Sequence, residues 1–427
     1  MKLQNILAIT AVGLAVLSCK ADFPFVQVQN GQFTGTDKSY FIGTNFWYGA
    51  ILASEGRGGD RPRLAKELDY LKSIGVTNLR VLVGGDGPDG VETRIEPTLQ
   101  KAPGEYNDTI FRGLDYLLCE LAKRDMKAVL YLNNSWEWSG GYGMYLEWAG
   151  EGKALIPAES GYPAYMESVS RFVCSAKAKA LFAEHVRTVV NRCNSITGLP
   201  YKEDPAIFSW QIGNEPRCFR SDPQVQQNFV EWMWESAALI KSLDRNHLVS
   251  SGSEGSWGCE GSMELYERIH SCPDIDYLNI HIWPYNWSWV REDSLDSKLD
   301  DAFANTDAYI DAHMELAAKL GKPVVIEEFG YPRDQFAFDK GASTVGRDAY
   351  YSHIFNRIVR AKEEGGLLAG CNFWAWGGFA SQSADHSNWR RGDDYCGDPA
   401  QEAQGLNSVY VGDSTVDLVR CYNEKLK

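Results

Sequence analysis

The sequence predicts an α/β fold of the (β/α)8 barrel type, formed by one domain. Two observations lead to this prediction. Eight short apolar segments that resemble buried strands alternate with helical patterns along the 427 residues. Polar and aromatic residues gather where these segments end, which is the edge at which parallel barrels carry their functional groups. A doubly wound open sheet is the alternative, but no Gly-x-Gly-x-x-Gly turn follows the first strand.

The first 18 residues predict a lipoprotein signal peptide rather than a part of the fold. Lys2 supplies a short positive region, and residues 6–17 form an apolar run that leads into Ser18 and Cys19. The pattern is similar to the bacterial lipoprotein signal, which implies export, cleavage before Cys19, lipidation of its thiol and anchoring to the outer membrane, the cell surface or the periplasmic face. An ordinary secretory signal that is cut slightly later is the alternative. Residues 19–32 are expected to form a tether and the start of a small hairpin.

The remaining segments follow one another in the order that a barrel requires. Asn30 and Gly31 form a turn signal within residues 23–40, which predicts the hairpin. The strand candidates are residues 40–50, 76–83, 127–133, 207–213, 247–252, 277–281, 323–326 and 368–376. The helix candidates are residues 61–74, 109–124, 176–194, 225–243, 263–270, 299–320 and 347–364. No linker or low-complexity run interrupts the series, so residues 33–427 are predicted to form a single domain.

The first helix candidate and the fourth strand candidate show why these segments are assigned as they are. Residues 61–74 carry Leu64, Leu68 and Leu71 on one helical face, and Gly75 ends the pattern. Residues 207–213 read Ile-Phe-Ser-Trp-Gln-Ile-Gly, a short apolar and aromatic run that stops abruptly at an Asn-Glu-Pro turn.

Composition and charge narrow the range of partners. The net charge of −15 and the pI near 5.0 argue against nucleic acid, whose phosphates the chain would repel. The 14 tryptophans and 21 tyrosines would suit the flat apolar faces of sugars wherever the rings are exposed. Nine cysteines follow Cys19, and their pairing cannot be deduced from the sequence. No Cys-x-x-Cys pair or histidine cluster at ligand spacing appears, so we expect no metal site. We also expect that the protein uses no cofactor and is a monomer.

The ends of the strand candidates define the candidate site. In chain order they carry Arg80, Asn134, Trp136, Asn214, Glu215, Glu254, His281, Trp283, Glu328 and Trp374. Two carboxylates that face each other across a pocket are the equipment of glycoside hydrolysis, in which one is held protonated and the other stays ionised. Glu215 and Glu328 are candidates for this pair, although a turn whose Glu215 faces solvent explains the first stretch equally well when it is taken alone.

Several motifs resemble glycoside hydrolase family 5. Residues 213–216 (Gly-Asn-Glu-Pro) and 327–330 (Glu-Glu-Phe-Gly) carry the resemblance to the family. The blocks that narrow it to the β-mannanase and β-mannosidase branch are residues 132–141, 248–255, 281–289 and 397–410. The resemblance implies a TIM barrel and a retaining hydrolase that cleaves β-1,4-mannosidic bonds of mannan, glucomannan or galactomannan, endo-acting by expectation.

Three other functions remain open at this point. An exo-acting β-mannosidase is the main alternative, because the long loop 377–404 would be able to wall off one end of the cleft. A β-1,4-glucanase and a non-catalytic glycan-binding lipoprotein are further alternatives. An opposed carboxylate pair argues against the last of these, since a binding module does not need one.

The resemblance also implies catalytic roles. The acid/base falls on Glu215 and the nucleophile on Glu328, with the two carboxyls about 5 Å apart. Glu327 competes for the second role, but alternation along a strand is expected to let only one of these neighbours face the pocket. Many members of the family have a tyrosine where this chain has Trp283, and the tyrosine hydroxyl bonds the nucleophile. Trp283 offers an indole N–H instead, which can donate one hydrogen bond but cannot accept one, so a different effect on the basicity of Glu328 is expected.

The other candidate residues are expected to bind or orient the substrate. Asn214 would bond the 2-hydroxyl of the sugar, Arg80 would orient the nucleophile, and Trp374 would form the sugar platform at the cleavage point. The remaining candidates for substrate contacts are Asn134, Trp136, Glu254, His281 and Trp283. Arg80 could instead be a structural ion-pair partner, and His281 could be a hydrogen-bonded core histidine.

Overall fold

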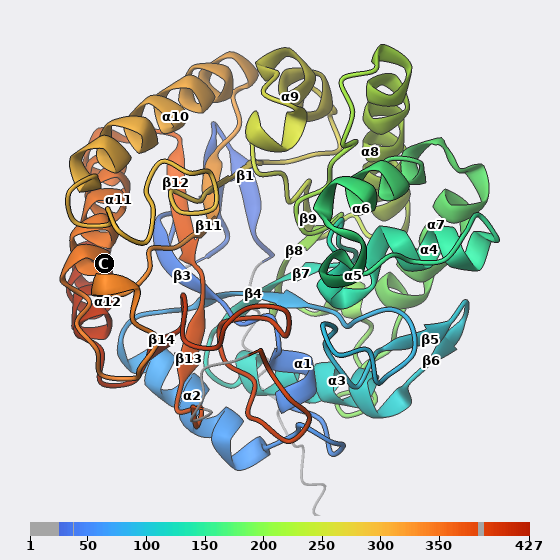
Figure 1. The fold of residues 1–427 in the computed structure, drawn as a ribbon, viewed down its shortest axis with the longest axis horizontal. Coiled ribbons are helices and arrows are strands. Elements are labelled where there is room, and N and C mark those ends of the chain that lie inside the picture. Colours follow the sequence, from blue (N-terminus) through green and yellow to red (C-terminus); the bar gives the residue numbers. More distant parts are fainter. Residues whose placement is uncertain (1–24, 37, 383–387) are drawn as a thin grey trace, which may run out of the picture.

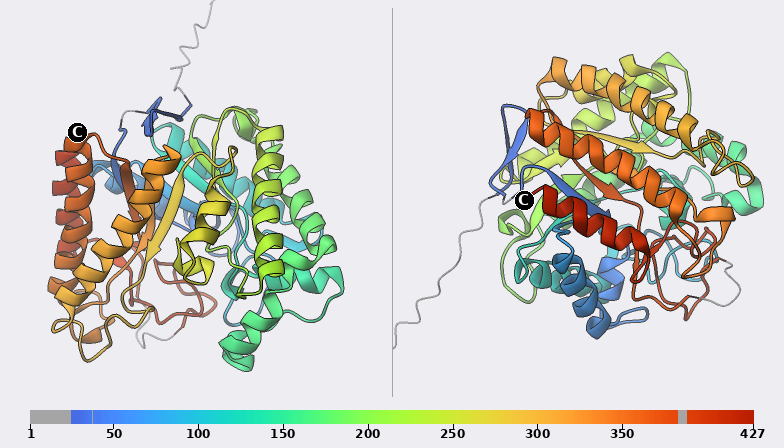
Figure 2. Two further views of the ribbon diagram at one scale, coloured as in Figure 1. Left: turned by 90° about the horizontal axis from the view of Figure 1, so that it is seen from above. Right: turned by 90° about the vertical axis from the view of Figure 1, so that its left-hand side faces the viewer.

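Eight parallel strands form the centre of the computed structural model, which describes residues 25–36, 38–382 and 388–427 (Figures 1 and 2). The strands are β3 (Phe41–Asn45), β4 (Asn78–Leu82), β7 (Lys127–Tyr131), β8 (Ile207–Gln211), β9 (Leu248–Ser250), β10 (Leu278–Ile282), β11 (Val324–Phe329) and β12 (Leu368–Phe373). Their order in the sheet is β10-β11-β12-β3-β4-β7-β8-β9, and a parallel bridge between Ser250 and Tyr277 joins β9 to β10. The predicted (β/α)8 barrel is confirmed, and each of the eight strand candidates overlaps one of these strands.

Each barrel strand is followed by a helix that packs on the outside of the barrel (Figure 1). These helices are α2 (Arg61–Ser73), α3 (Asp108–Ala122), α7 (Ala176–Val190), α8 (Pro223–Leu243), α9 (Met263–His270), α10 (Leu299–Leu320), α11 (Val345–Glu364) and α12 (Ser414–Lys425). Side chains that favour N-caps start several of them: Asp60 accepts from the Arg63 N–H and Ser175 from the Ala178 N–H. The sequence did not predict α12, a short and mostly polar helix that buries Val416, Val419 and Tyr422.

The hairpin of β1 (Gln27–Gln29) and β2 (Gln32–Thr34) closes the end of the barrel where the strands begin, as the Asn30 and Gly31 turn predicted (Figure 2). Phe33 on β2 packs into that end, with its ring centroid 5.1 Å from Phe208 and 5.4 Å from Tyr277. Because these aromatic rings fill the entrance, the accessible site has to lie at the opposite end, where the strands finish.

Additional elements build up that opposite end. Between β7 and α7 the chain forms a lobe of α4 (Gly141–Ala149), α5 (Pro157–Ser160) and α6 (Tyr162–Val169). After β12 it forms a long loop that is pinned by pairing of β13 (Trp376–Gly378) with β14 (Val409–Tyr410). A small pair of strands, β5 (Gln100–Ala102) and β6 (Glu105–Tyr106), follows β4, and the four-residue helix α1 (Gly49–Leu52) follows β3.

The predicted signal peptide, residues 1–18, and the lipidation candidate Cys19 lie outside the described residues. All nine cysteines after Cys19 are unpaired thiols. Within the described ranges, no helix combines the length and the apolar character that crossing a membrane requires.

Candidate active site

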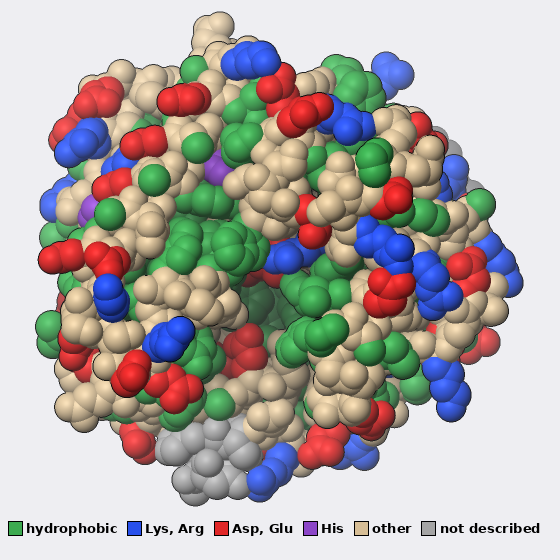
Figure 3. All heavy atoms as spheres, turned by 45° about the horizontal axis from the view of Figure 1, so that its top comes forward, with side chains coloured by type: hydrophobic (Ala, Val, Ile, Leu, Met, Phe, Trp, Pro, Cys, Tyr) green, Lys and Arg blue, Asp and Glu red, His purple; other side chains and the backbone are tan. Residues whose placement is uncertain are grey.

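A cleft of about 320 Å³ opens at the carboxyl ends of the strands. Figure 3 shows the hollow in this face, surrounded largely by hydrophobic side chains with acidic and basic ones beside them. Seven of the predicted site residues line the cleft, namely Trp136, Asn214, Glu215, Glu254, Trp283, Glu328 and Trp374. The other three, Arg80, Asn134 and His281, lie behind this lining and are at most 1 % exposed.

Glu215 and Glu328 face each other across the floor of the cleft. One oxygen of each carboxyl and one ring nitrogen of His281 all lie within 4.8 Å of one another. Nδ1 of His281 is 2.8 Å from Oε1 of Glu215 and 3.4 Å from Oε2 of Glu328. Carboxyls about 5 Å apart characterise glycosidases that form a covalent intermediate, because the gap leaves no room for water on the far side of the sugar.

The backbone directs the side chain of Glu215 into the cleft. Glu215 follows β8 and has a positive φ of 49°, a conformation that non-glycine residues adopt only when the surroundings enforce it. Its N–H donates to the carbonyl of Gly252 at 3.0 Å, and its own carbonyl accepts from the hydroxyl of Ser135. Contacts to the loops on both sides therefore fix the turn that presents this carboxyl.

Arg80 on β4 connects most of the polar groups under the cleft. Its guanidinium donates to the Glu328 carboxylate, to Oε1 of Gln211 at 2.7 Å, to Oδ1 of Asn214 at 2.8 Å and to Oδ1 of Asn45 at 3.1 Å. The side chain is fully buried, and its planar fork fixes the direction of each bond. Arg80 lies below the cleft floor, and its hydrogen bonds orient both Glu328 and Asn214.

Glu327 lies beneath the cleft, although its side chain faces the barrel interior as that of Glu328 does. Its carboxylate accepts from Gln211 and from the hydroxyl of Tyr277, and it lies 3.3 Å from Nε of Arg80. Only one of the two neighbours lines the cleft, as expected, but strict alternation is not the reason: the register of β10 and β11 shifts so that His281 pairs with Glu328 and Glu327 is the extra residue. Glu328 lines the cleft, whereas Glu327 occupies the layer below.

Burial raises the pKa of both carboxyls in the cleft. At Glu328 burial is opposed by the Arg80 charge and reinforced by the charge of Glu215. At Glu215 burial is opposed by Arg217 and by the indole N–H of Trp136. Burial, and then the Arg80 charge, hold the pKa of His281 well below its usual value, so the imidazole between the carboxyls is neutral.

Ionising both carboxyls at this distance costs electrostatic free energy, because the two negative charges repel each other. The pair therefore holds one proton over a wide pH range. Arg80 forms an ion pair with Glu328, which keeps that carboxyl ionised and leaves the proton on Glu215. A protonated Glu215 is able to donate to Nδ1 of the neutral His281. By distance, Glu215, His281 and Glu328 could also hold a metal ion, but the guanidinium next to Glu328 disfavours a second positive charge there.

Aromatic rings form the walls beside the carboxyl pair. The indole of Trp136 donates to Oε2 of Glu215 at 2.5 Å. The ring of Trp374 lies edge-on to Trp283 at 6.1 Å and to Trp138 at 6.4 Å. Trp283 contributes to lowering the pKa of Glu215 and has no hydrogen bond to Glu328 within the described chain. The indole of Trp283 therefore acts on Glu215, and Trp283 does not take over the bond to the nucleophile that the family's tyrosine makes.

Asn134 and Glu254 are held by other protein groups. Oδ1 of Asn134 accepts from the side-chain amide of Asn214 at 3.2 Å and from the backbone N–H of Trp136 at 3.0 Å. The side-chain amide of Asn134 donates to the hydroxyl of Ser139 at 2.9 Å. Asn134 thus positions two residues that line the cleft. Glu254 forms a two-pronged ion pair with Arg217, whose Nη2 lies 2.6 Å from Oε1.

The sequence reasoning missed several residues that line the cleft. Arg217 belongs to the wall next to Glu215, and its guanidinium lies 5.2 Å from the ring of Trp136. Tyr162 comes from the lobe of α4–α6, and Gln401 and Glu402 come from the loop after β12. Arg217 could have been found from its position two residues after Glu215. Tyr162 begins the short helix α6 and the other two come from a loop, and none of the three carries a comparable signal.

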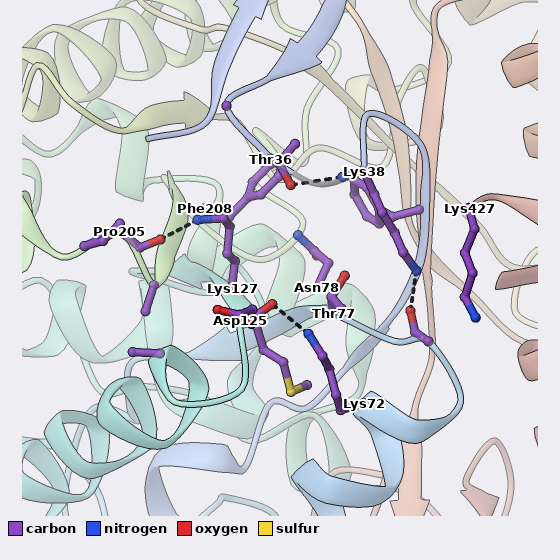
Figure 4. A pocket seen from close by; sticks show the side chains of 16 residues that line it. Thr36, Lys38, Lys72, Thr77, Asn78, Asp125, Lys127, Pro205, Phe208 and Lys427 are labelled. Carbon is purple, nitrogen blue, oxygen red and sulfur yellow. Dashed lines mark hydrogen bonds between the residues drawn. The ribbon is translucent and has the colours of Figure 1, made fainter. Parts of the chain in front are cut away.

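A second cavity, of about 220 Å³, lies at the opposite end of the barrel (Figure 4). Its lining includes Lys38, Lys72 and Lys127, whose ammonium groups bond to the backbone carbonyls of Gly75, Asp125 and Pro205. Phe41 and Phe208 supply apolar walls. The cavity contains no opposed pair of carboxylates, so the chemistry is assigned to the cleft.

Comparisons with known proteins agree with this geometry. Residues 23–427 match the family model described as GH family 5 beta-mannosidase-like. Mannan endo-1,4-beta-mannosidase 1 of Oryza sativa subsp. japonica is 30% identical over 366 residues, which cover 82% of this chain and 78% of the relative. Mannan endo-1,4-beta-mannosidase 7 of Arabidopsis thaliana is 30% identical over 363 residues, covering 82% and 77%.

Solved structures give the same picture. The glycoside hydrolase family 5 mannosidase from Rhizomucor miehei has a TM-score of 0.86 and 35% identity, covering 95% of this chain and 98% of that structure. The endo-beta-1,4-mannanase from Thermotoga petrophila has a TM-score of 0.65 and 23% identity, covering 91% and 77%, and so supports the fold alone.

Proposed function

The chain belongs to the glycoside hydrolase family 5 β-mannosidase-like family, and on this premise we propose that it hydrolyses β-1,4-mannosidic bonds of mannan-type polysaccharides or manno-oligosaccharides with retention of configuration. The observation that carries the proposal is the pair of buried carboxyls, Glu215 and Glu328, held close together at the carboxyl end of a parallel barrel. Glu215 acts as the acid/base and Glu328 as the nucleophile.

The first step transfers the sugar to the protein. Glu215 gives its proton to the glycosidic oxygen, that oxygen leaves with the bonding electrons, and a Glu328 oxygen bonds to the anomeric carbon from the opposite face. Arg80 keeps Glu328 ionised and oriented for this attack. Asn214, which is fixed by Arg80 and Asn134, is placed to bond the 2-hydroxyl of the sugar as the transition state forms.

The second step releases the sugar. Glu215, now ionised, removes a proton from a water molecule, and the resulting hydroxide attacks the anomeric carbon and breaks its bond to Glu328. Burial favours a proton on Glu215, and the guanidinium of Arg80 favours an ionised Glu328 once it is free. The pair returns to its starting state, and the two inversions restore the β configuration.

The mode of action has two candidates, endo and exo. Endo action would agree with the curated plant relatives, which are named as mannan endo-1,4-beta-mannosidases. A specific observation favours exo action: Pro399, Gln401 and Glu402, from the loop after β12, line the cleft. The family 5 mannosidase from Rhizomucor miehei also matches over 95% of the chain.

One experiment tests the function and separates the modes. The purified protein is incubated side by side with mannan, glucomannan, galactomannan, cellulose and mannohexaose, and the products are sized. Hydrolysis of the mannans but not of cellulose is expected. A spread of oligomers from mannohexaose would establish endo action, and mannose alone would establish exo action. Hydrolysis of cellulose alone would overturn the proposed substrate.

We also propose that the protein is exported and anchored by lipid at Cys19, which rests on the sequence pattern of residues 1–19. The described chain begins at the end of the barrel away from the cleft, so a tether there would leave the cleft open to polysaccharide (Figure 2). Labelling of cells with a fatty-acid analogue should mark the protein, and the variant Cys19→Ala should not be marked. Equal labelling of both would exclude Cys19 as the attachment point.

A further inference from the structure

We propose that Trp257 and Trp287 form a stacking platform on the leaving-group side of the cleft, which selects an oligosaccharide rather than a small alcohol as the leaving group. The inference rests on the proposed function and specifies its substrate. Trp257 and Trp287 both line the cleft, and Trp257 is 40% exposed although its ring is large and apolar. A flat, exposed aromatic ring inside a cleft that binds sugars offers a stacking surface to a pyranose.

The platform is a stack of aromatic rings. The rings of Trp257 and Trp287 are 4.6 Å apart and nearly parallel, with an angle of 18° between them. Trp287 is buried and packs in turn against Trp289 and Tyr309, both with centroids at 5.1 Å. Of these four rings only that of Trp257 is exposed; Trp287 is buried, and the partly buried Trp289 and Tyr309 support it from behind.

The backbone under Trp257 is held as firmly as its ring. The Trp257 N–H donates to the hydroxyl of Tyr309 at 3.1 Å, and this hydroxyl donates to the carbonyl of Glu254 at 2.7 Å. The neighbouring Ser256 N–H donates to Nε2 of His313 at 2.9 Å. A ring that is already ordered loses little conformational freedom when a sugar stacks on it, so most of the contact energy is available for binding.

A continuous wall leads from the acid/base to this platform. Glu215 is followed by Arg217, Arg217 forms the ion pair with Glu254, and Trp257 follows on the same loop after β9. A Cβ on Gly258 would lie 3.2 Å from Oε2 of Glu254, which shows how closely the loop is packed against that pair. Because the acid gives its proton to the leaving oxygen, the wall that begins at Glu215 borders the leaving group.

The other residues that line the cleft come from different elements. Trp374 lies next to Trp138, and Gln401 and Glu402 come from the loop after β12. None of them belongs to the wall that runs from Glu215 through Arg217 and Glu254 to Trp257. Trp257 therefore acts on the part of the substrate that departs, and its contribution should depend on how long that part is.

The test compares leaving groups of increasing length. The kcat/KM of wild type, Trp257→Ala and Trp257→Phe is measured with an aryl β-mannoside and with mannobiose, mannotriose and mannotetraose. The ratio of kcat/KM for mannotetraose to that for the aryl mannoside should fall about tenfold to a hundredfold in Trp257→Ala and less in Trp257→Phe, which keeps a flat ring. Trp234→Ala is the matched control, because Trp234 is 39% exposed but lies on α8 and does not line the cleft.

Each result has a defined meaning. An unchanged ratio in both Trp257 variants, with wild type active on every substrate, would overturn this inference and leave the proposed function intact. An equal fall of the ratio in Trp234→Ala would also overturn it. Absence of wild-type activity on every mannoside would overturn the proposed function, and the inference with it. Should Trp257→Ala fail to fold, the Trp257→Phe ratio decides, and a value equal to wild type counts against the platform.

Discussion

Two adjacent glutamates, Glu327 and Glu328, should respond to removal in opposite ways. Glu328→Ala removes the group that bonds to the sugar, so kcat should fall by roughly 10⁴-fold or more. Its effect on stability should be small, since Arg80 keeps its bonds to Gln211, Asn45 and Asn214. Glu327→Ala should lower kcat by less than about 100-fold, because Glu327 does not line the cleft.

The loss of stability in Glu327→Ala follows from its contacts. The variant takes away the acceptor for Gln211 and Tyr277 and the second carboxylate beside Arg80, all of them buried. Each deprived donor costs about 1–3 kcal/mol, so the two together cost about 2–6 kcal/mol. For a chain of this length the entropy of unfolding is about 0.9 kcal/mol/K, so the expected fall in Tm is about 2–7 °C.

Azide distinguishes the two variants directly. With an activated aryl β-mannoside, azide should attack the face that Glu328→Ala leaves open and restore turnover with an α-mannosyl azide product, whereas Glu327→Ala should gain nothing. Thermal unfolding and initial rates at 25 °C complete the assay. A stable but inactive Glu327→Ala that azide rescues, beside an active Glu328→Ala, would show that the nucleophile has been assigned to the wrong residue.

Two further predictions concern charge. Arg80→Lys keeps a cation but loses the planar fork. The loss of one charged hydrogen bond of about 1.5–3 kcal/mol should lower kcat about 10- to 150-fold. The acid limb of the pH–rate profile should move to higher pH, because Glu328 loses the group that lowers its pKa. An unmoved acid limb would show that Arg80 does not control Glu328. Burial raises the pKa of Glu402 to about 8, and its Oε2 is shut off from solvent without a hydrogen-bond partner among the described residues. Its stabilising contribution is therefore complete below the pKa of an unfolded glutamate and is lost as pH rises through 8, so the Tm of Glu402→Gln relative to wild type should increase between pH 5 and pH 9. A constant Tm difference across that range would contradict the raised pKa.

The barrel and the carboxyl pair could be predicted because they depend on simple patterns. Residues 207–213 are apolar and lead into a polar turn, and the same pattern recurs at residues 323–326, so Glu215 and Glu328 are expected at the same edge of the sheet. The glutamates are 113 residues apart in sequence (328 − 215), but strand order brings them together. The prediction of the fold was correct because hydrophobic periodicity determines which strands and helices form.

Details that depend on strand register and on side-chain direction could not be predicted from the sequence. The register shift between β10 and β11 breaks the alternation at Glu327 and Glu328, and no local residue pattern predicts this shift. The sequence left open which carboxyl the indole of Trp283 would bond, and in the structure it bonds Glu215. Arg217 and Glu402 enter the cleft from loops, whose paths are set by tertiary contacts such as the Arg217–Glu254 ion pair.

The stereochemistry of the first product tests the central claim most directly. Proton NMR is recorded in the first minutes after wild-type protein is added to mannotriose, before the anomers equilibrate. If Glu328 bonds to the anomeric carbon and Glu215 then activates water, two inversions leave the β-anomer as the first signal to grow. An initial α-anomer would mean a single displacement by water, which contradicts the covalent role given to Glu328 and the acid/base cycle given to Glu215.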